Sequence, residues 1–372
     1  MTSRDEDDRV GLAPDTGFPY HWLYQDPTES PFTGRFAKGE YFEDLDYNNG
    51  CTQQFIFDVC KFWLDEYQLD GIRLDYTLGF YLPADPTRGL PKLVTDLKQY
   101  LADTNRSDVI LTIEHLTDNR YEAIGVANAV GATSCWYDRF LYDPAEYAAR
   151  GQLDAKLIRV LDTAREFADG KGPTIYVENH DHSTLVNRVG GRQRWWKAQP
   201  PLLALFTSPG AILLHNGQEF GDDYYLPATG SERVQPRPLH WSLRDDSVGQ
   251  HLLRLHQRLI QMRRAHPALR GGSFYPRSYD EQWARFNDQG YGVDTDRDVV
   301  IYHRWGDAAD GQPERFIVVL NFSAYDQYVD VPFSTNGTWH DLLNDQSHEV
   351  RDFRLPNHRI PSSWGKIFYQ KG

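Results

Sequence analysis

The stretch Trp63–Tyr76, which reads WLDEYQLDGIRLDY, constrains the fold of this chain more than any other stretch. The stretch begins with the end of a longer run in which apolar residues recur at roughly helical spacing. We therefore expect a helix over Cys51–Tyr67 that packs inward on one apolar face. Gly71 interrupts that pattern, and the next residues alternate between apolar and charged with the two-residue period of a β-strand. The expected inward face of the helix consists of Val59, Phe62, Trp63 and Tyr67. The stretch therefore predicts a helix, a turn and a strand in direct succession.

The charged residues of this strand, Arg73 and Asp75, lie two positions apart and therefore share one face. Ile72 and Leu74 point to the opposite face. Burying opposite charges is costly unless they pair, and an isolated arginine and aspartate at this spacing are most often a structural ion pair. The alternative is a functional site, and the ends of two later strands favour it.

Apolar strands alternate with helical stretches from residue 70 to about residue 220. Such alternation is typical of a parallel α/β sheet or barrel. The expected strands are Asp70–Asp75, Val109–Glu114, Ser134–Tyr137, Thr174–Glu178 and Ala211–Leu214. The expected helices between them include Leu90–Leu101 and Leu153–Phe167.

The pattern changes after the strongly amphipathic stretch Leu252–Ala265, which we expect to be a helix ended by His266 and Pro267. The chain beyond it contains short apolar runs that are typical of a small all-β domain. Its expected strands are Val299–Arg304, Phe316–Asn321, Gln327–Val331 and Lys366–Tyr369. A chain of 372 residues is long enough for two domains. The expected divisions are a polar segment at residues 1–49, an α/β part at residues 50–270 and an all-β domain at residues 271–372.

Two further strands of the expected sheet also lead into acidic residues. The apolar run Val109–Ile113 ends in Glu114 and is followed by His115. The run Thr174–Val177 leads into the sequence Glu-Asn-His-Asp, which ends at Asp181. One acid at a strand end is most often the N-cap of a helix. Active sites of parallel α/β barrels lie at the carboxyl ends of the strands, so three such acids favour an active site over three caps.

The composition limits which kinds of molecule the chain is expected to bind. The net charge of −14 disfavours nucleic acid and anionic membrane surfaces. Aromatic residues make up 14% of the chain, and their rings suit the flat faces of sugars, although an aromatic-rich core would give the same figure. The acidic N-terminus does not resemble a signal peptide, and no run of about 18 apolar residues could span a membrane, so we expect a cytoplasmic protein. Three cysteines do not make a disulfide framework.

Three short motifs in these strands resemble signature regions of the α-amylase family, glycoside hydrolase family 13. The motifs are DGIRLD at Asp70–Asp75, TIEH at Thr112–His115 and ENHD at Glu178–Asp181. Further similar patches are Phe42–Asn49, Ser208–Phe220 and Arg237–Trp241. The resemblance extends from about Tyr20 to the end of the chain, with the motifs in the family's order. It implies an α/β fold, namely a truncated (β/α) barrel of the α-amylase type with about five strands, followed by a C-terminal all-β sandwich domain.

The resemblance also implies roles for individual residues. Asp75 matches the family's nucleophile, Glu114 its general acid/base, and Asp181 the third carboxylate, which binds sugar hydroxyls and stabilises the transition state. Retention of configuration needs two carboxyl groups about 5–5.5 Å apart, one nucleophilic and one protonated. Arg73 would hold Asp75 ionised, while burial and a neighbouring carboxylate would keep Glu114 protonated. The expected substrate contacts are Arg73, His180, Tyr76, His115 and Trp136, together with Tyr224.

With these roles the resemblance implies a glycoside hydrolase that cleaves α-1,4-glucosidic bonds in starch, glycogen or maltooligosaccharides by a covalent double displacement. Maltogenic action, debranching and glucan transfer use the same carboxylates and stay open as alternatives. A different alternative is a non-catalytic, glucan-binding truncated homologue. All three carboxylates are present, and a relic under no selection would lose at least one of them, so we favour an enzyme.

The chain departs from the family's pattern before Asp70. No counterpart of the family's first signature precedes that residue, so we expect the first three barrel strands to be missing and residues 1–49 to be the remnant of loop domain B. The segment Tyr76–Gly79 replaces the family's usual Lys-His. We expect no cofactor, because the family's calcium site would lack a ligand, although a calcium ion stays open. His180 and His182 have the spacing of a metal site, but no third ligand is evident.

An open remnant of five strands would expose two strand edges and an apolar interior. The chain is then a natural truncation, one fragment of a longer protein, or a glucan-binding relic. We expect a homodimer that covers the open edges, with the segment 1–49 as the other candidate cover.

Overall fold

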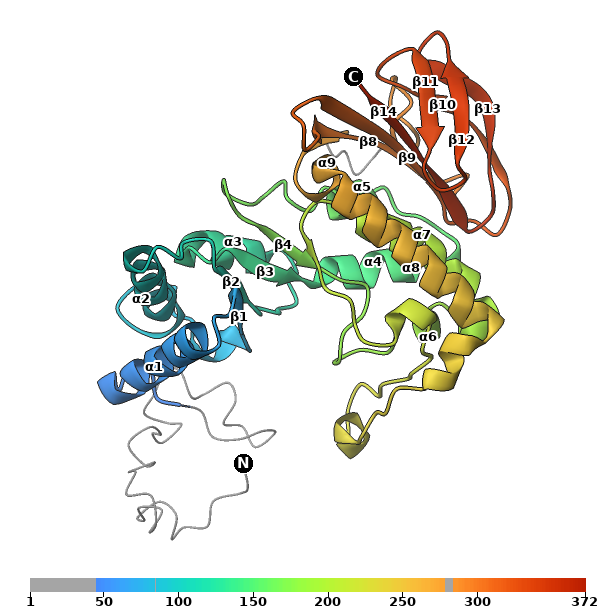
Figure 1. Ribbon diagram of the computed structural model, residues 1–372. Helices are drawn as coiled ribbons and strands as arrows, with labels where there is room; N and C mark the ends of the chain where they lie inside the picture. Colours follow the sequence, from blue (N-terminus) through green and yellow to red (C-terminus); the bar gives the residue numbers. More distant parts are fainter. Residues whose placement is uncertain (1–44, 84, 278–283) are drawn as a thin grey trace. The chain divides into compact units, whose positions relative to one another are not determined.

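The computed structural model describes residues 45–83, 85–277 and 284–372 (Figure 1). These residues belong to two compact units. The first contains the described residues up to Trp136 together with Phe167–Gly172, and the second contains Tyr137–Glu166 together with Pro173–Gly372. Most of the segment 1–49, expected to be the remnant of loop domain B, lies outside the described residues. The domain limits expected at residues 49 and 270 stay a prediction.

Within the described residues, five short strands make one sheet in the order β1-β2-β3-β4-β5. The neighbours β1 and β2, β2 and β3, and β4 and β5 all pair in parallel. The strands are β1 (Gly71–Leu74), β2 (Ile110–Ile113), β3 (Ser134–Tyr137), β4 (Gly172–Ile175) and β5 (Ala211–Ile212). This arrangement confirms the α/β class that the alternation of strands and helices predicts.

The register of β1 and β2 places two of the motif acids side by side. Leu74 pairs with Ile113 across the two strands. The next residues, Asp75 and Glu114, therefore leave the sheet at the same edge. The backbone N–H of Glu114 donates to the carbonyl of Leu74 at 2.9 Å, which extends the hydrogen-bonded ladder by one position. The sheet thus delivers both carboxyl groups to one place by backbone geometry alone.

Helices α1 and α2 of the first unit pack against each other (Figure 1). The helical segments of this unit are α1 (Gly50–Glu66), η3 (Thr77–Phe80), α2 (Gly89–Asp103) and α3 (Glu122–Val130). Asn49 caps α1, because its side chain accepts a hydrogen bond from the N–H of Cys51 at 2.8 Å. The hydroxyl of Tyr100 in α2 donates to Asp65 in α1 at 2.6 Å. The helices expected over Cys51–Tyr67 and Leu90–Leu101 are confirmed.

The expected inward face of α1 is wrong. Its four residues are between 37% and 59% exposed, namely Val59, Phe62, Trp63 and Tyr67. The residues that the helix buries are instead Thr52, Cys60 and Leu64. The helix carries apolar residues on more than one side, so helical periodicity alone could not decide which side packs against the rest of the unit.

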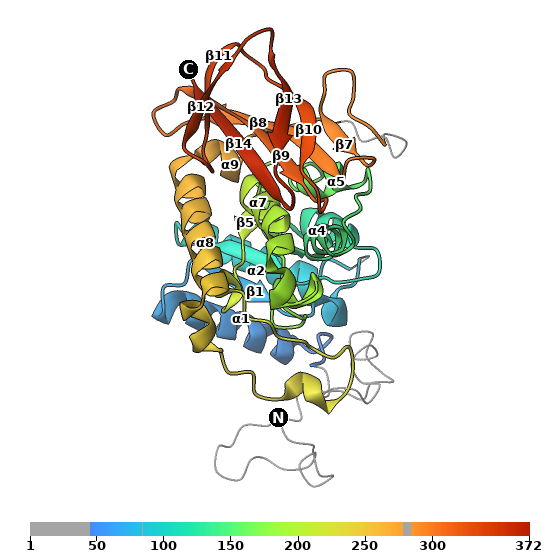
Figure 2. The same cartoon turned by 90° about the vertical axis from the view of Figure 1, so that its right-hand side faces the viewer.

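Helix α7 is buried along its whole length in the second unit. It packs against α8 and against strands β9 (Pro313–Asn321) and β14 (Trp364–Lys371) (Figure 2). The helices of this unit are α4 (Asp138–Arg150), α5 (Leu157–Leu161), α6 (Leu185–Arg188), α7 (Gln199–Thr207), α8 (Ser247–Ala265) and α9 (Pro267–Arg270). The expected helix Leu252–Ala265 is confirmed as the greater part of α8, which ends before His266 as predicted.

The expected helix Leu153–Phe167 is shorter in the structure. Only α5 is helical there, and the chain turns after Leu161. The hydroxyl of Thr163 donates to the carbonyl of Pro209 at 2.5 Å, which ties the turn to a distant loop. A tertiary hydrogen bond of this kind competes with helix continuation and leaves no trace in the periodicity.

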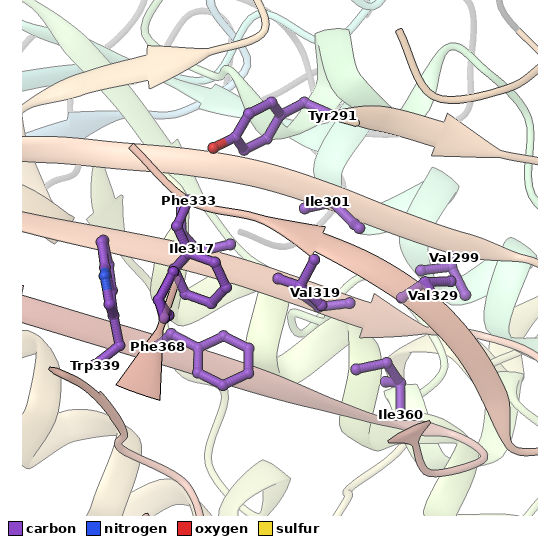
Figure 3. Close-up of a cluster of buried hydrophobic side chains, with 12 residues drawn as sticks. Tyr291, Val299, Ile301, Ile317, Val319, Val329, Phe333, Trp339, Ile360 and Phe368 are labelled. Atoms are coloured by element: carbon purple, nitrogen blue, oxygen red, sulfur yellow. The ribbon is translucent and has the colours of Figure 1, made fainter. Parts of the chain in front are cut away.

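The C-terminal part of the second unit is all-β, as expected. In the described residues, strands β12-β11-β14-β9-β8-β6 follow one another in one sheet, β7 pairs with β8, and β10 and β13 form a second sheet. The remaining bounds are β6 (Ser273–Tyr275), β7 (Gly292–Asp294), β8 (Val299–Asp307), β10 (Gln327–Pro332), β11 (Gly337–Asp341), β12 (Gln346–Val350) and β13 (Arg354–Ile360). Val329 and Ile360 of the second sheet pack with Val319 and Phe368 of the first in one buried cluster (Figure 3).

In the part of the chain that the structure describes, no helix combines the length and the apolar character needed to cross a membrane. Within the described residues, none of the three cysteines takes part in a disulfide bond. Cys51 is exposed, whereas Cys60 and Cys135 are buried.

Candidate active site

One arginine in the first unit contacts both of the acids that follow β1 and β2. The Nη1 atom of Arg73 lies 2.9 Å from Oδ1 of Asp75. Its Nη2 atom lies 2.8 Å from Oε2 of Glu114. The pairing of Arg73 with Asp75 that the strand period predicts is therefore present, and the same guanidinium also contacts the carboxyl group of the neighbouring strand. Arginine suits this position because its planar fork can address two oxygens at once.

The aromatic ring of Trp136 lies against this guanidinium. The central carbon of the Arg73 guanidinium is 3.9 Å from the centroid of the ring. Trp136 comes from β3 and is only 4% exposed. Cation–π contacts of this kind contribute on the order of 0.5–2 kcal/mol. Trp136 therefore supports Arg73 from the interior of the unit in this structure.

The two carboxyl groups have opposite environments. The side chain of Asp75 is 75% exposed, whereas that of Glu114 is 9% exposed. Burial, and next a hydrogen bond with Asp75, raise the pKa of Glu114 to about 7. The N–H of Tyr76, which donates to Oε2 of Glu114 at 3.0 Å, and the charge of Arg73 act in the opposite direction on that pKa. Burial outweighs them, so Glu114 retains a proton far above the pH at which an exposed glutamic acid loses it.

The backbone turns sharply after Asp75. Tyr76 adopts a left-handed conformation with φ 40° and ψ 53°, which is uncommon for an aromatic residue. The next residue, Thr77, donates its N–H to the carbonyl of Glu114 at 2.8 Å and its hydroxyl to the same carbonyl at 2.7 Å. This turn fixes Tyr76 and Glu114 relative to each other. No role for Thr77 is expected from the sequence, because a positive φ at the preceding residue is not visible in a residue pattern.

His115 lies in the interior of the first unit. Its Nδ1 atom is 3.0 Å from the hydroxyl of Thr77, and its ring meets that of Tyr81 edge-on with centroids 5.3 Å apart. Its Nε2 atom lies 3.8 Å from Oε1 of Glu122. His115 is buried, and its contacts in this structure are with other side chains of the first unit.

The second unit holds the loop that contains His180 and Asp181. The Nε2 atom of His180 lies 3.3 Å from Oδ2 of Asp181. The side-chain oxygen of Asn179 accepts the N–H of Asp181 at 3.0 Å. Arg233 donates to the carbonyl of Asp181 at 3.1 Å, and Arg237 donates to that of His180 at 2.6 Å. Several hydrogen bonds thus hold this loop in one conformation.

Strand β4 ends earlier than expected. The sequence predicts a strand over Thr174–Glu178, but β4 ends at Ile175. Glu178 is buried, and its carboxylate accepts the N–H of Leu185 at 2.5 Å and lies 3.4 Å from Nδ1 of His215. Burial raises the pKa of Glu178. Sequence reasoning missed this acid as a structural anchor, although its place in the ENHD motif was a signal.

The side chain of His182 contacts two other side chains of the second unit. The ring nitrogens of His182 contact the side-chain oxygen of Asn179 at 2.7 Å and the hydroxyl of Tyr142 at 2.9 Å. No group of three or more His, Cys, Asp or Glu side chains that could hold a metal ion occurs in residues 45–83, 85–277 or 284–372.

The structure thus gathers most of the expected site residues in the first unit. These are Arg73, Asp75, Tyr76, Glu114, His115 and Trp136. Asp181, His180 and Tyr224 belong to the second unit. The guanidinium of Arg237 lies 5.3 Å from the ring centroid of Tyr224. The catalytic and sugar-binding roles of all these residues stay predictions.

Two protein-family models match the chain. The model of the α-amylase catalytic domain matches residues 15–236, and that of the α-amylase C-terminal all-β domain matches residues 291–362. "Alpha-amylase 2" of Dictyoglomus thermophilum is 22% identical over 78% of this chain and 45% of its own length. The 1,4-alpha-glucan branching enzyme GlgB of Marinobacter nauticus is 25% identical over 86% of this chain and 51% of its own length. The chain spans about half the length of the curated relatives it matches.

Solved structures share the fold at low sequence identity. An Anoxybacillus α-amylase has a TM-score of 0.69 and 16% identity over 94% of this chain and 70% of its own. A pullulanase of Anoxybacillus sp. LM18-11, solved with maltotriose, has a TM-score of 0.66 and 18% identity over 95% of this chain and 49% of its own. At these identities the likeness concerns the fold alone.

Proposed function

The chain belongs to the α-amylase family, and from this premise we propose that it is a retaining hydrolase of α-1,4-glucosidic bonds in starch, glycogen or maltooligosaccharides. One observation carries the proposal. Arg73 contacts both an exposed carboxylate, Asp75, and a buried carboxyl group, Glu114, whose pKa lies at about 7. A retaining glycosidase needs this combination of an ionised and a protonated carboxyl group.

Asp75 is the proposed nucleophile. Its carboxylate attacks the anomeric carbon of the bound sugar, while Glu114 gives its proton to the departing glycosidic oxygen. The bond between Asp75 and the sugar forms as the glycosidic bond breaks. In the second step Glu114 takes a proton from water, the water oxygen attacks the anomeric carbon, and the ester to Asp75 is released. Both carboxyl groups then return to their starting charge states.

Arg73 stabilises the carboxylate of Asp75 through the contact between Nη1 and Oδ1. Its contact with Glu114 stabilises the negative charge that Glu114 carries in the second half of the reaction, after Glu114 has given up its proton. Trp136 acts in this proposal as a positioning residue beneath Arg73, because its ring is buried against the guanidinium. Its earlier expected role as a sugar contact is less favoured by that burial.

Asp181 and His180 are proposed to bind sugar hydroxyl groups. The loop that carries them is held by Asn179 and by two arginines, and both side chains are partly exposed. A carboxylate held in this way can accept hydrogen bonds from two neighbouring hydroxyl groups.

Glucan transfer is the second candidate function. The relatives include several 1,4-alpha-glucan branching enzymes, with the Marinobacter protein among them. Transfer uses the same glycosyl-enzyme and differs only in the acceptor, which is a sugar hydroxyl in place of water. Maltogenic action, debranching and non-catalytic glucan binding remain further alternatives.

The test is to incubate the chain with soluble starch and to measure both new reducing ends and new α-1,6 branches. Hydrolysis raises the number of reducing ends, whereas branching raises the number of α-1,6 linkages at a nearly constant number of reducing ends. Glu114→Gln should abolish either activity. Asp118→Asn, which makes the same acid-to-amide change at an exposed residue of the same unit, is the matched control. If the wild-type chain produces neither new reducing ends nor new α-1,6 branches, an enzymatic role on starch is refuted.

A further inference from the structure

A pocket of about 740 Å³ lies in the C-terminal part of the second unit. Its walls come from the end of β6, from the loop before β7, from β8, from the end of β10 and from the turn between β12 and β13. None of the residues assigned to the proposed catalytic site lines it. Its volume is within the range of sites that bind small organic ligands.

Four rings of the pocket lining contact one another in succession. The rings of Tyr275 and Tyr291 meet edge-on with centroids 5.3 Å apart. His303 and Trp305 lie two residues apart on β8, so they share one face of the strand, and their centroids are 4.8 Å apart. Tyr291 and His303 join the two pairs, since their rings are nearly parallel at 6.3 Å. The hydroxyl of Tyr275 accepts a hydrogen bond from Asn287 at 3.0 Å. The wall is therefore preformed.

Phe353 is a further aromatic residue of the pocket lining. It is 56% exposed, and its backbone has a φ of 57°, which is unusual for a bulky residue. Its N–H donates to the side-chain oxygen of Asn336 at 2.8 Å, and its carbonyl accepts the N–H of Phe333 at 2.9 Å. The turn thus holds an exposed phenylalanine in a position where glycine or asparagine would be less strained. A ring kept there without being buried points to a contact with a ligand.

The charged residues of the lining limit the kind of ligand. Asp288, Asp330 and Asp352 contribute carboxylates, and Arg354 contributes a guanidinium, whose Nη1 atom is 3.8 Å from Oδ2 of Asp330. An excess of carboxylates disfavours phosphates and other anions. Charged side chains in the lining also disfavour a wholly apolar peptide. A neutral molecule with flat apolar faces and many hydroxyl groups fits both parts, because rings stack on its faces while carboxylates accept from its hydroxyls.

We propose that this pocket is a second, non-catalytic binding site for a segment of an α-glucan chain. The choice of an α-glucan, rather than another carbohydrate, rests on the proposed function of the chain. Phe353 and Trp305 supply stacking surfaces, and Asp330 and Asp352 accept hydrogen bonds from sugar hydroxyls. Such a site holds the polymer on the C-terminal part independently of the chemistry at Asp75 and Glu114.

The experiment is native electrophoresis in gels that contain soluble starch, with free maltoheptaose as the competing ligand. All proteins carry Glu114→Gln, so that the polymer stays intact during the run. Phe353→Asn removes the ring and keeps a residue that tolerates a positive φ. Phe353→Tyr keeps the ring, and Tyr325→Asn removes an exposed ring of the same β part that does not line the pocket. Thermal unfolding of each variant checks that the domain is folded.

We expect Phe353→Asn to weaken the retardation by starch by about tenfold in dissociation constant, whereas Phe353→Tyr and Tyr325→Asn retain it. Equal retardation of Phe353→Asn and Tyr325→Asn would overturn the proposal, as would an absence of retardation in the parent protein. Reducing-end release by the chain without Glu114→Gln is measured in parallel. Retardation that depends on Phe353 in a chain without hydrolytic activity supports the pocket and refutes only the proposed hydrolysis. Hydrolysis without such dependence refutes only the pocket.

Discussion

The Nη2 atom of Arg73 lies 2.8 Å from Oε2 of Glu114, the carboxyl group that must carry a proton for the proposed first step. A cation at this distance favours the ionised form of the acid. The pKa of Glu114 is nevertheless raised to about 7, because burial has the larger effect. Arg73 therefore moderates the acidity of Glu114, so that the group can both give and take a proton near neutral pH.

Asp75→Asn and Glu114→Gln should each reduce the hydrolysis of soluble starch by about a thousandfold or more, because each removes a group that forms a bond or transfers a proton. Both changes keep the shape of the side chain, so the fold should persist, as circular dichroism can verify. Asp118→Asn should retain activity. Near wild-type turnover in either site variant would show that the roles are assigned wrongly.

Arg73→Lys should lose most of the activity, because a lysine cannot contact Asp75 and Glu114 at the same time with a planar fork. The charge of Arg73 lowers the pKa of Glu114, so a weaker contact raises that pKa and moves the alkaline limb of kcat/KM to higher pH. The measurement is kcat/KM against pH for both proteins, and an unchanged profile would count against the role of Arg73.

Glu114 should also make the stability of the protein depend on pH. Its pKa is 4.5 as an ordinary glutamic acid and about 7 in the folded chain, so the folded state binds the proton more tightly between these values. Stability contributed by the protonated group is therefore present below about pH 4.5 and is lost as pH rises to about 7. Glu114→Gln has no proton to lose at this position. As pH rises across this window, its free energy of unfolding should therefore increase relative to that of the wild type, by at most on the order of 3 kcal/mol.

Urea unfolding at a series of pH values measures this difference. The gain should level off above about pH 7, where Glu114 is ionised in both states. A constant difference between the two proteins from pH 4.5 to 7 would show that Glu114 titrates normally in the folded state.

The cluster of Arg73, Asp75 and Glu114 in the first unit was largely predictable from the sequence. The two-residue period of a strand places Arg73 and Asp75 on one face, and parallel pairing brings the ends of β1 and β2 together. These are local rules that a residue pattern can express. The contact between Arg73 and Glu114 follows from the register of two neighbouring strands, which the motifs indicated but did not determine.

The supports around this group could not be predicted in the same way. The left-handed backbone of Tyr76 aims its N–H at Glu114, and nothing in an aromatic residue indicates a positive φ. Trp136 was expected to touch sugar because it follows a strand, yet its ring lies against Arg73. Both features depend on which atoms meet across the fold, and a sequence pattern records only which faces are apolar.

Helix α1 exposes a cluster of apolar side chains toward its C-terminal end. The rings of Phe62, Trp63 and Tyr67 contact one another with centroids 4.7–5.9 Å apart, and Val59 lies on the same helix. Apolar clusters of this kind on a surface are typical of interaction sites. We predict that a second copy of the chain covers this face, because closed twofold pairing is the commonest way for like chains to bury a shared patch.

Light scattering at micromolar concentration should therefore give a mass of twice 43.0 kDa. The double change Phe62→Ser and Trp63→Ser should return the mass to that of one chain without unfolding α1, since both side chains are about half exposed. Tyr325→Ser, which alters an exposed ring of the β part, should leave the dimer intact. The interface is apolar, so raising the salt concentration should not dissociate it, in contrast to an association held by charges. A wild-type mass of 43.0 kDa, or a dimer that survives the double change, would contradict the prediction that a second copy of the chain covers α1.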